Sequence, residues 1–139
     1  MIAGRIGSIL TSAPKRMLKS AFSLLGYGIV PSEYLKSLVE SQDPRARLLS
    51  EISDNQRIYV EPFLPYSKSQ VAQDLFVLSE LALRELPPYF VEFGATDGIS
   101  LSNTWLLENC LGWQGLLAEP AHVWRRLLAE NRKCKTDFR

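Results

Sequence analysis

The spacing of apolar residues divides the chain into a helical part and a part that alternates strands with helices. Up to residue 88 the apolar positions recur every three or four residues, as in amphipathic helices. From residue 89 the pattern changes to short apolar runs followed by turns, which indicates strands. The pattern predicts helices over 15–25, over 32–41, from 44 onward and over 67–83, with a proline-containing connector over 54–66.

Capping residues support these helix boundaries. Asp43 is a good N-cap, and Pro44 suits the first helical position. Ser67 and Gln70 match a capping box, so we expect Ser67 to begin the helix over 67–83. Side chains expected on the buried helix faces include Leu35, Leu38, Val39, Leu48, Leu49, Ile52, Val71, Ala72, Leu75 and Leu78.

The second part of the chain predicts one βαβ unit and the helix after it. Strands are expected over 89–93 and 114–118, with a turn over 94–98 after the first strand. Ser102 or Asn103 should cap the intervening helix, and Glu119 should end the second strand. Such a unit normally belongs to a doubly wound parallel sheet, whose ligands bind at the carboxyl ends of the strands. The expected organisation is a helical N-terminal region over 1–66 and an α/β domain over 67–139.

The turn after the first strand lacks the motifs that bind phosphates. A dinucleotide fingerprint counted from Gly94 would need glycine where Thr96 and Ile99 stand, and no Gly-Lys-Ser/Thr follows. Glu92 and Asp97 flank the turn, and their charges would repel a pyrophosphate but attract a cation. The residues therefore favour S-adenosylmethionine, which has no phosphate and carries a positive sulfonium and a positive amino group.

Two carboxylates have both a binding interpretation and a structural one. Glu92 lies within an apolar strand, and a buried carboxylate needs a polar partner. That partner is either a ligand or nearby backbone amides. Glu119 could accept hydrogen bonds from the two hydroxyls of a ribose, or could simply cap the helix that begins at Pro120.

Composition excludes several classes of function. The formal net charge is +1, so no nucleic-acid partner is indicated. Cys110 and Cys134 have no metal-ligand spacing, so no metal site is expected, and they suit a reducing, cytoplasmic location. The apolar stretch over 21–30 is too short to span a bilayer, so we expect no stable membrane insertion. The basic helix over 15–25 could lie on an anionic membrane, although such helices more often pack on their own domain.

Linked motifs along the second half of the chain resemble the FkbM-type methyltransferase family. The resemblance covers about residues 67–134, and Ala72 stands where the family often has glycine. The motifs are Ser69-Gln-Val-Ala-Gln-Asp-Leu-Phe76, Tyr89-Phe-Val-Glu-Phe-Gly-Ala-Thr-Asp-Gly98, Leu101-Ser-Asn-Thr-Trp-Leu-Leu-Glu108, Leu111-Gly-Trp-Gln-Gly-Leu-Leu-Ala-Glu-Pro120 and Asn131-Arg132.

This resemblance implies a Rossmann-like class I methyltransferase that uses S-adenosylmethionine. The acceptor would be a hydroxyl on a sugar, polyketide or similar small molecule. The resemblance implies that Glu119 holds the ribose of the cofactor. It does not identify a catalytic base. The residues expected in the cofactor pocket are Glu92, Gly94, Ala95, Asp97, Gly98, Ser102, Asn103 and Glu119.

The predicted elements cover only the first βαβα of such a fold. We expect the third strand to begin where the sequence stops, at Arg139, and therefore expect a cofactor-binding fragment. The alternative is a non-catalytic remnant or interaction module that keeps the methyltransferase signature. A nucleotide-sugar binding domain is disfavoured by the charges of Glu92 and Asp97.

Overall fold

The computed structural model describes residues 30–81 and 89–139, so the predictions for 15–25 and for the last residues of 67–83 lie outside the described residues. The described residues form two compact units. The helical unit contains 30–65 and 75–81, and the sheet unit contains 66–74 and 89–139. Residues 75–81, expected to belong with the α/β domain, thus group with the N-terminal helices.

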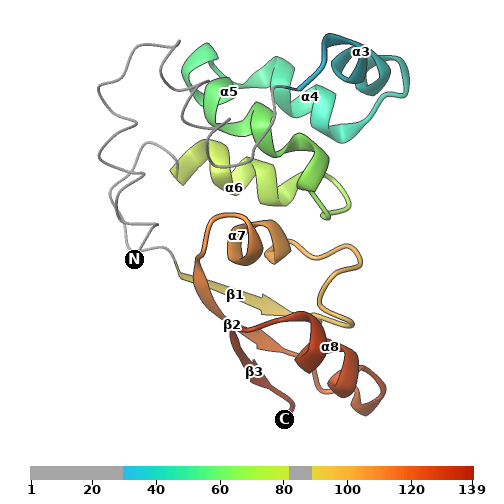
Figure 1. Cartoon of the computed structure of the whole chain (residues 1–139), viewed down its shortest axis with the longest axis vertical. Coiled ribbons are helices and arrows are strands. Elements are labelled where there is room, and N and C mark those ends of the chain that lie inside the picture. Colours follow the sequence, from blue (N-terminus) through green and yellow to red (C-terminus); the bar gives the residue numbers. More distant parts are fainter. Residues whose placement is uncertain (1–29, 82–88) are drawn as a thin grey trace. The chain divides into compact units, whose positions relative to one another are not determined.

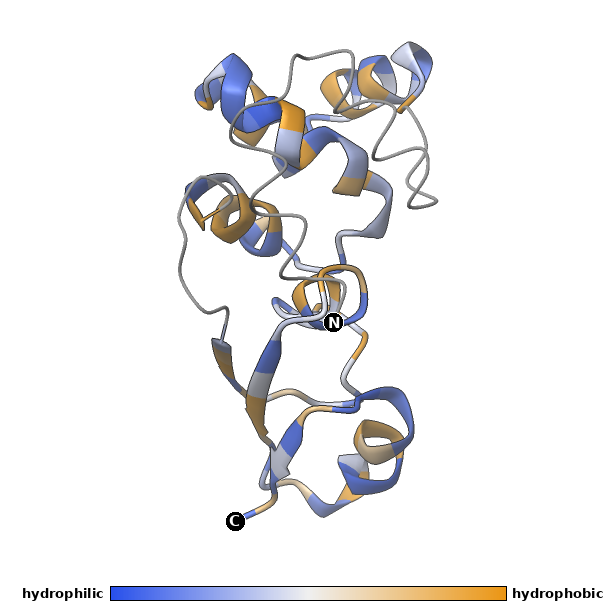
Figure 2. Ribbon diagram, turned by 60° about the vertical axis from the view of Figure 1, so that its left-hand side comes forward, coloured by the Kyte–Doolittle hydropathy of each residue, from blue (hydrophilic) through white to orange (hydrophobic). Residues whose placement is uncertain are grey.

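The helical unit consists of short amphipathic helices in which hydrophobic and hydrophilic residues alternate (Figure 2). The Asp43 carboxylate accepts the Arg45 backbone N–H at 2.8 Å, which confirms the predicted N-cap. Leu38, Leu48 and Leu49 are buried as expected, whereas Val39 is 67% exposed, contrary to expectation. The helices are α3 (Ser32–Glu40), α4 (Pro44–Glu51), α5 (Asp54–Val60), the 3-10 helix η1 (Glu61–Tyr66) and α6 (Gln73–Leu81) (Figure 1).

The predicted connector over 54–66 is wrong, because these residues form α5 and η1. The Ser53 hydroxyl and the Gln56 side chain form a capping box that begins α5. A 3-10 helix accommodates Pro65, and this segment buries Tyr59, Val60, Phe63 and Leu64. The prolines favour a connector, but the segment also contains a capping signal and apolar residues that form much of the core.

The predicted capping box at Ser67 is also wrong, because α6 begins only at Gln73. The carboxylate of Asp74 accepts the hydroxyl of Ser67 at 2.8 Å and that of Ser69 at 2.5 Å. It also accepts the Lys68 backbone N–H at 3.0 Å. This buried acid therefore organises an irregular segment where a helix was expected, and Val71 in that segment is exposed.

The sheet unit is mixed α/β, with a small parallel sheet in the order β1-β2-β3. β1 (Tyr89–Phe93) and β2 (Gln114–Ala118) have the predicted bounds, and β3 (Lys135–Asp137) pairs beside β2. The expectation that no third strand precedes Arg139 is therefore wrong. Between the strands lie α7 (Trp105–Asn109), the 3-10 helix η2 (His122–Trp124) and α8 (Arg125–Asn131).

One face of β1 is covered and the other is open. Phe90 and Glu92 are buried, and the Phe90 ring lies so close to Gly115 that a Cβ there would be 2.2 Å from a ring carbon. Because both crossovers run in the same direction along the sheet, α7 and α8 come to the same face. The opposite face of β1 leaves Tyr89, Val91 and Phe93 exposed by 60%, 50% and 81%.

No helix within 30–81 or 89–139 is both long enough and apolar enough to cross a membrane.

Candidate functional site

The turn after β1 and the acid after β2 meet at the same edge of the sheet. Phe93 pairs with Ala118 at the ends of the two strands, and the Gly94 N–H donates to the Ala118 carbonyl at 2.8 Å. The carboxyl ends of parallel strands are where α/β sheets bind their ligands. The structure thus brings together two features that lie far apart in the sequence.

Glu119 links this turn to the segment after β2. Its Oε2 accepts the Thr96 backbone N–H at 2.8 Å, and its Oε1 accepts the Ala121 backbone N–H at 2.8 Å. The side chain is buried within the chain, with the residue only 4% exposed. No helix begins at Pro120, and η2 begins at His122 without a side-chain cap hydrogen bond, so the capping interpretation of Glu119 is wrong. The contact with Thr96 instead attaches the carboxylate to the turn.

The two glycines of the turn serve different structural purposes. Gly94 has φ of +73°, and a Cβ added there would meet nothing within 4 Å, so the turn is open at this point. Gly98 has φ of +81°, and a Cβ there would lie 2.6 Å from Arg132 Cγ and 2.8 Å from Leu128 Cδ1. Glycine is therefore needed at 98 for close packing as well as for its backbone conformation.

Asp97 shapes the second half of the turn. Its Oδ1 accepts the backbone N–H groups of Ile99 at 2.9 Å and Ser100 at 2.7 Å, and its Oδ2 accepts the Ser100 hydroxyl at 2.7 Å. Burial alone would raise the pKa of Asp97, but these hydrogen bonds outweigh it and lower the pKa below the usual 3.8. The carboxylate is therefore ionised at neutral pH and engaged by its own loop.

Glu92 finds its polar partners within the chain. Its Oε2 accepts the hydroxyls of Ser102 at 3.0 Å and Thr104 at 2.5 Å, and its Oε1 accepts the Asn103 backbone N–H at 2.8 Å. Arg132 Nη1 lies 3.8 Å from Oε2. A buried carboxylate with these partners does not by itself require a ligand.

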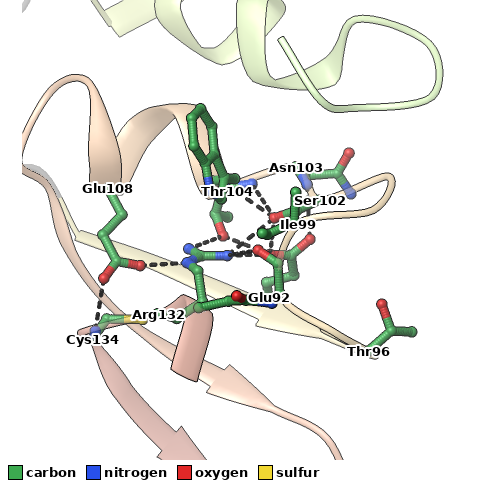
Figure 3. Close-up of polar contacts among 12 residues, drawn as sticks. Glu92, Thr96, Ile99, Ser102, Asn103, Thr104, Glu108, Arg132 and Cys134 are labelled. Atoms are coloured by element: carbon green, nitrogen blue, oxygen red, sulfur yellow. Dashed lines mark hydrogen bonds and ion pairs between the residues drawn. The ribbon is translucent and has the colours of Figure 1, made fainter. Parts of the chain in front are cut away.

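Among the other predicted pocket residues, Ser102 lies inside this cluster and also receives the N–H of Trp105 at 3.0 Å. The prediction that Ser102 or Asn103 caps this helix, α7, is wrong, however, because its N-cap is Thr104, which makes no side-chain capping hydrogen bond. The Asn103 side chain points away from the cluster in Figure 3, and its buried Oδ1 has no hydrogen-bond partner among the described residues. Ala95, within the turn, is buried.

Arg132 is the residue that sequence reasoning missed. Its side chain is fully buried, and Figure 3 shows the guanidinium between Glu92 on one side and Glu108 on the other. Nε donates to Glu108 Oε2 at 2.5 Å. Arg132 belongs to the Asn131-Arg132 motif, to which the sequence alone assigns no role. The signal that could have identified it is that a buried Glu92 needs a cation.

Glu108 joins this cluster to the start of β3. Its Oε1 accepts the backbone N–H groups of Lys133 at 2.7 Å and Cys134 at 2.8 Å. Burial would raise the pKa of Glu108, but hydrogen bonds from Arg132, Cys134 and Lys133 lower it below 4.5. Burial, and then the neighbouring Glu108, raise the pKa of the Cys134 thiol to about 12, so this thiol is a poor nucleophile.

The predicted residues therefore fall into two connected groups. Glu92, Ser102 and the Asn103 amide form the buried cluster around Arg132, whereas Glu119 and Gly94 lie at the open end of the turn. His122, in η2 after β2, is exposed. No set of three His, Cys, Asp or Glu residues within the described ranges is arranged to hold a metal ion.

Comparison with known proteins yielded no matching family model, curated protein or solved structure. The resemblance to the FkbM-type methyltransferases therefore stays a prediction from the sequence motifs.

Proposed function

We propose that this chain is the cofactor-binding portion of an S-adenosylmethionine-dependent methyltransferase acting on a hydroxyl of a sugar, polyketide or similar small molecule. The observation that carries the proposal is the contact between Glu119 and the turn after β1. Its carboxylate holds the Thr96 N–H at 2.8 Å, beside a glycine whose missing side chain leaves open space. A ligand in that space would lie against the turn that Glu119 holds.

The hydrogen-bonding capacity of Glu119 fits a ribose. An ionised carboxylate offers about four lone-pair sites, and the Thr96 and Ala121 amides use two of them. The remaining sites can accept the two hydroxyls of a ribose. The unpartnered Oδ1 of Asn103, whose side chain points away from the Glu92 cluster, is a further acceptor suited to a donor such as an amino group.

The charges around the turn favour a cationic ligand. Glu92, Asp97 and Glu119 contribute three carboxylates, and the buried Arg132 is shared between Glu92 and Glu108. A phosphate here would meet like charge, whereas the sulfonium and amino groups of S-adenosylmethionine meet opposite charge. This argues against a nucleotide sugar as the ligand.

S-adenosylmethionine, when bound, supplies a methyl group on an already activated leaving group. The residues assigned here bind and orient that cofactor, which leaves positioning as their contribution to rate. Removal of the acceptor proton requires a base, and none of the assigned residues is given that role.

Calorimetric titration of the full chain with S-adenosylhomocysteine tests the proposal. We expect saturable binding that weakens by about tenfold or more in Glu119→Ala, since hydrogen bonds to a charged group contribute about 1.5–3 kcal/mol. Glu119→Gln keeps the shape of the side chain and removes its charge, so it measures the contribution of the charge to binding. Glu130→Gln, an exposed acid on α8, is the matched control and should bind normally.

Circular dichroism must show that each variant is folded, because Glu119 also holds two backbone amides. Absence of binding by the folded wild-type chain would refute the proposal. Affinity for a nucleotide sugar without affinity for S-adenosylhomocysteine would identify the other class of ligand.

A second candidate function, a non-catalytic interaction module, is favoured by the open face of β1. Tyr89, Val91 and Phe93 form an exposed apolar row of a kind that parallel sheets normally cover. The same titration separates the two candidates, because an interaction module has no need to retain affinity for the cofactor.

A further inference from the structure

The end of α8 reaches the backbone of the glycine turn. Asn131 Nδ2 donates to the Asp97 carbonyl at 2.8 Å, and Arg132 Nη1 donates to the Gly98 carbonyl at 3.0 Å. Both contacts join residues 34 positions apart in the chain. Two consecutive carbonyls of the turn are thus held by two consecutive side chains of one helix end.

We propose that Arg132, assisted by Asn131, is a positioning residue of the cofactor site, which fixes the glycine turn and orients Glu92 through the hydroxyls of Ser102 and Thr104. This inference rests on the proposed function, since it assigns a role within the same site.

The direction of the hydrogen bonds supports this assignment. Arg132 donates to the Ser102 hydroxyl at 3.1 Å and to the Thr104 hydroxyl at 2.9 Å. A hydroxyl has one proton and two lone pairs. With an arginine donor occupying a lone pair of each hydroxyl, their protons point to Glu92 Oε2, at 3.0 and 2.5 Å. Arg132 thereby sets the orientation of a carboxylate that it does not directly hydrogen-bond.

The geometry of the guanidinium is specific to arginine. Nε binds Glu108, Nη1 binds Gly98 and Ser102, and Nη2 binds Thr104, all within a side chain that is fully buried. A lysine ammonium keeps the charge but offers only three donors from a single nitrogen, so it cannot reach these partners together.

The charge distribution gives this arrangement a consequence for ligand binding. Arg132 lies closer to Glu108, at 2.5 Å, than to Glu92, at 3.8 Å. One cation therefore serves two carboxylates, and the excess negative charge lies on Glu92, which is farther from the cation. Such an excess favours a positively charged ligand group.

The turn itself is fitted to Arg132. A Cβ on Gly98 would lie 2.6 Å from Arg132 Cγ, so the stem of the arginine occupies the volume that any other residue would need. The position of the turn and the position of the arginine side chain are mutually dependent.

Titration with S-adenosylhomocysteine of full-length chains tests the inference. Arg132→Lys should weaken binding by about tenfold, while Arg126→Lys, an exposed change on the same helix, should leave it unchanged. The double variant of Arg132→Lys and Glu92→Gln tests whether Arg132 acts through Glu92. If it does, Arg132→Lys should lose most of its effect on binding when Glu92 is neutralised.

The outcomes separate the two proposals. Wild-type chain that fails to bind refutes the proposed function and this inference together. Wild-type binding with Arg132→Lys within about twofold of it refutes only the positioning role, whereas an undiminished effect of that change in the Glu92→Gln background refutes the orientation of Glu92 by Arg132.

Asn131→Ala serves if Arg132→Lys does not fold, since it removes only the contact to the Asp97 carbonyl. A threefold or so loss of affinity with an unchanged circular dichroism spectrum supports the positioning of the turn, and unchanged affinity contradicts it.

Discussion

The helical unit and the sheet unit are stabilised in different ways. Among the described residues, the buried polar or charged side chains are Asp74, Ser79, Glu92, Ser102, Thr104, Glu119 and Arg132, and all except Ser79 belong to the sheet unit. The helical unit instead buries leucines, Val60 and aromatic residues, and its caps are local. Buried polar networks are costly when incomplete, so their concentration in one unit indicates where function constrains the sequence.

The largest expected effect comes from removing the shared cation. Arg132→Met leaves Glu92 and Glu108 buried without a counter-charge, which should destabilise the sheet unit by about 3–5 kcal/mol. Amide hydrogen exchange measured at increasing urea concentrations gives the stability of each unit separately, at Leu117 in β2 and at Tyr59 in α5. The contrast between the two units predicts that the amide of Leu117 loses protection from exchange and that the amide of Tyr59 does not.

Two control variants give the range against which the effect of Arg132→Met is judged. Arg126→Met removes an exposed arginine and should change stability by less than about 0.5 kcal/mol. Leu64→Ala creates a cavity in the helical unit and should cost about 2–5 kcal/mol at Tyr59. If Arg132→Met cost no more than Arg126→Met, the contrast between the units would be refuted.

The next effect distinguishes the two glycines of the turn. Gly98→Ala meets both a left-handed backbone and the side chains of Arg132 and Leu128, which should cost roughly 2–4 kcal/mol. Gly94→Ala meets only the backbone penalty of about 1–2 kcal/mol, since its Cβ enters open space. Thermal unfolding of the two variants measures the difference, and equal losses would contradict the packing role of Gly98.

Acidification should affect the sheet unit at a higher pH than the helical unit. The folded pKa of Glu108 lies below 4.5, so its contribution to stability is present above that pH and is lost as pH falls below it. The pKa of Asp43 is lowered from 3.8, chiefly by the hydrogen bond from Arg45, so the corresponding loss in the helical unit begins at a lower pH.

Urea midpoints measured across this pH range check the order of the two losses. Glu108→Gln should flatten the acid limb of the sheet unit, whereas Glu51→Gln, which changes an exposed acid of α4, should not. An acid limb unchanged by Glu108→Gln would show that the Arg132 cluster does not contribute to it.

The smallest expected effect is a gain in the helical unit. Gln42 follows α3 with φ of +55°, and the Asp43 N–H reaches back to the Leu38 carbonyl at 3.0 Å, as at many glycine-terminated helices. Gln42→Gly should stabilise this unit by about 0.5–1 kcal/mol. Thermal unfolding of Gln42→Ala, which keeps the strained backbone, provides the control and should show no such gain.

Features that depend on neighbouring residues could be predicted from the sequence. The strands over 89–93 and 114–118 are apolar runs bounded by turn residues, and the Asp43 cap precedes Pro44 directly. The strand β3 was missed because Lys135, Thr136 and Asp137 form a short polar run that becomes a strand only by pairing with β2.

Features that depend on distant partners could not be read in this way. The sequence indicates that Glu92 is a buried acid in need of a partner, but Arg132 lies 40 positions later and its approach depends on the path of α8. The motif at Ser67 predicts a helix cap because the competing acceptor, Asp74, lies beyond the motif. Local patterns thus located the polar residues but did not identify which of them pair.

The tight fit between Phe90 and Gly115 has a consequence for how the sequence can change over evolutionary time. A Cβ at 115 would lie 2.2 Å from the Phe90 ring, and Arg132 lies over the same ring at 5.7 Å while filling the space beside Gly98. Each large side chain thus occupies volume that a glycine leaves open. Substitutions at these positions are therefore epistatic: a glycine can be replaced only after its large neighbour has become smaller, so relatives should exchange these residues in pairs.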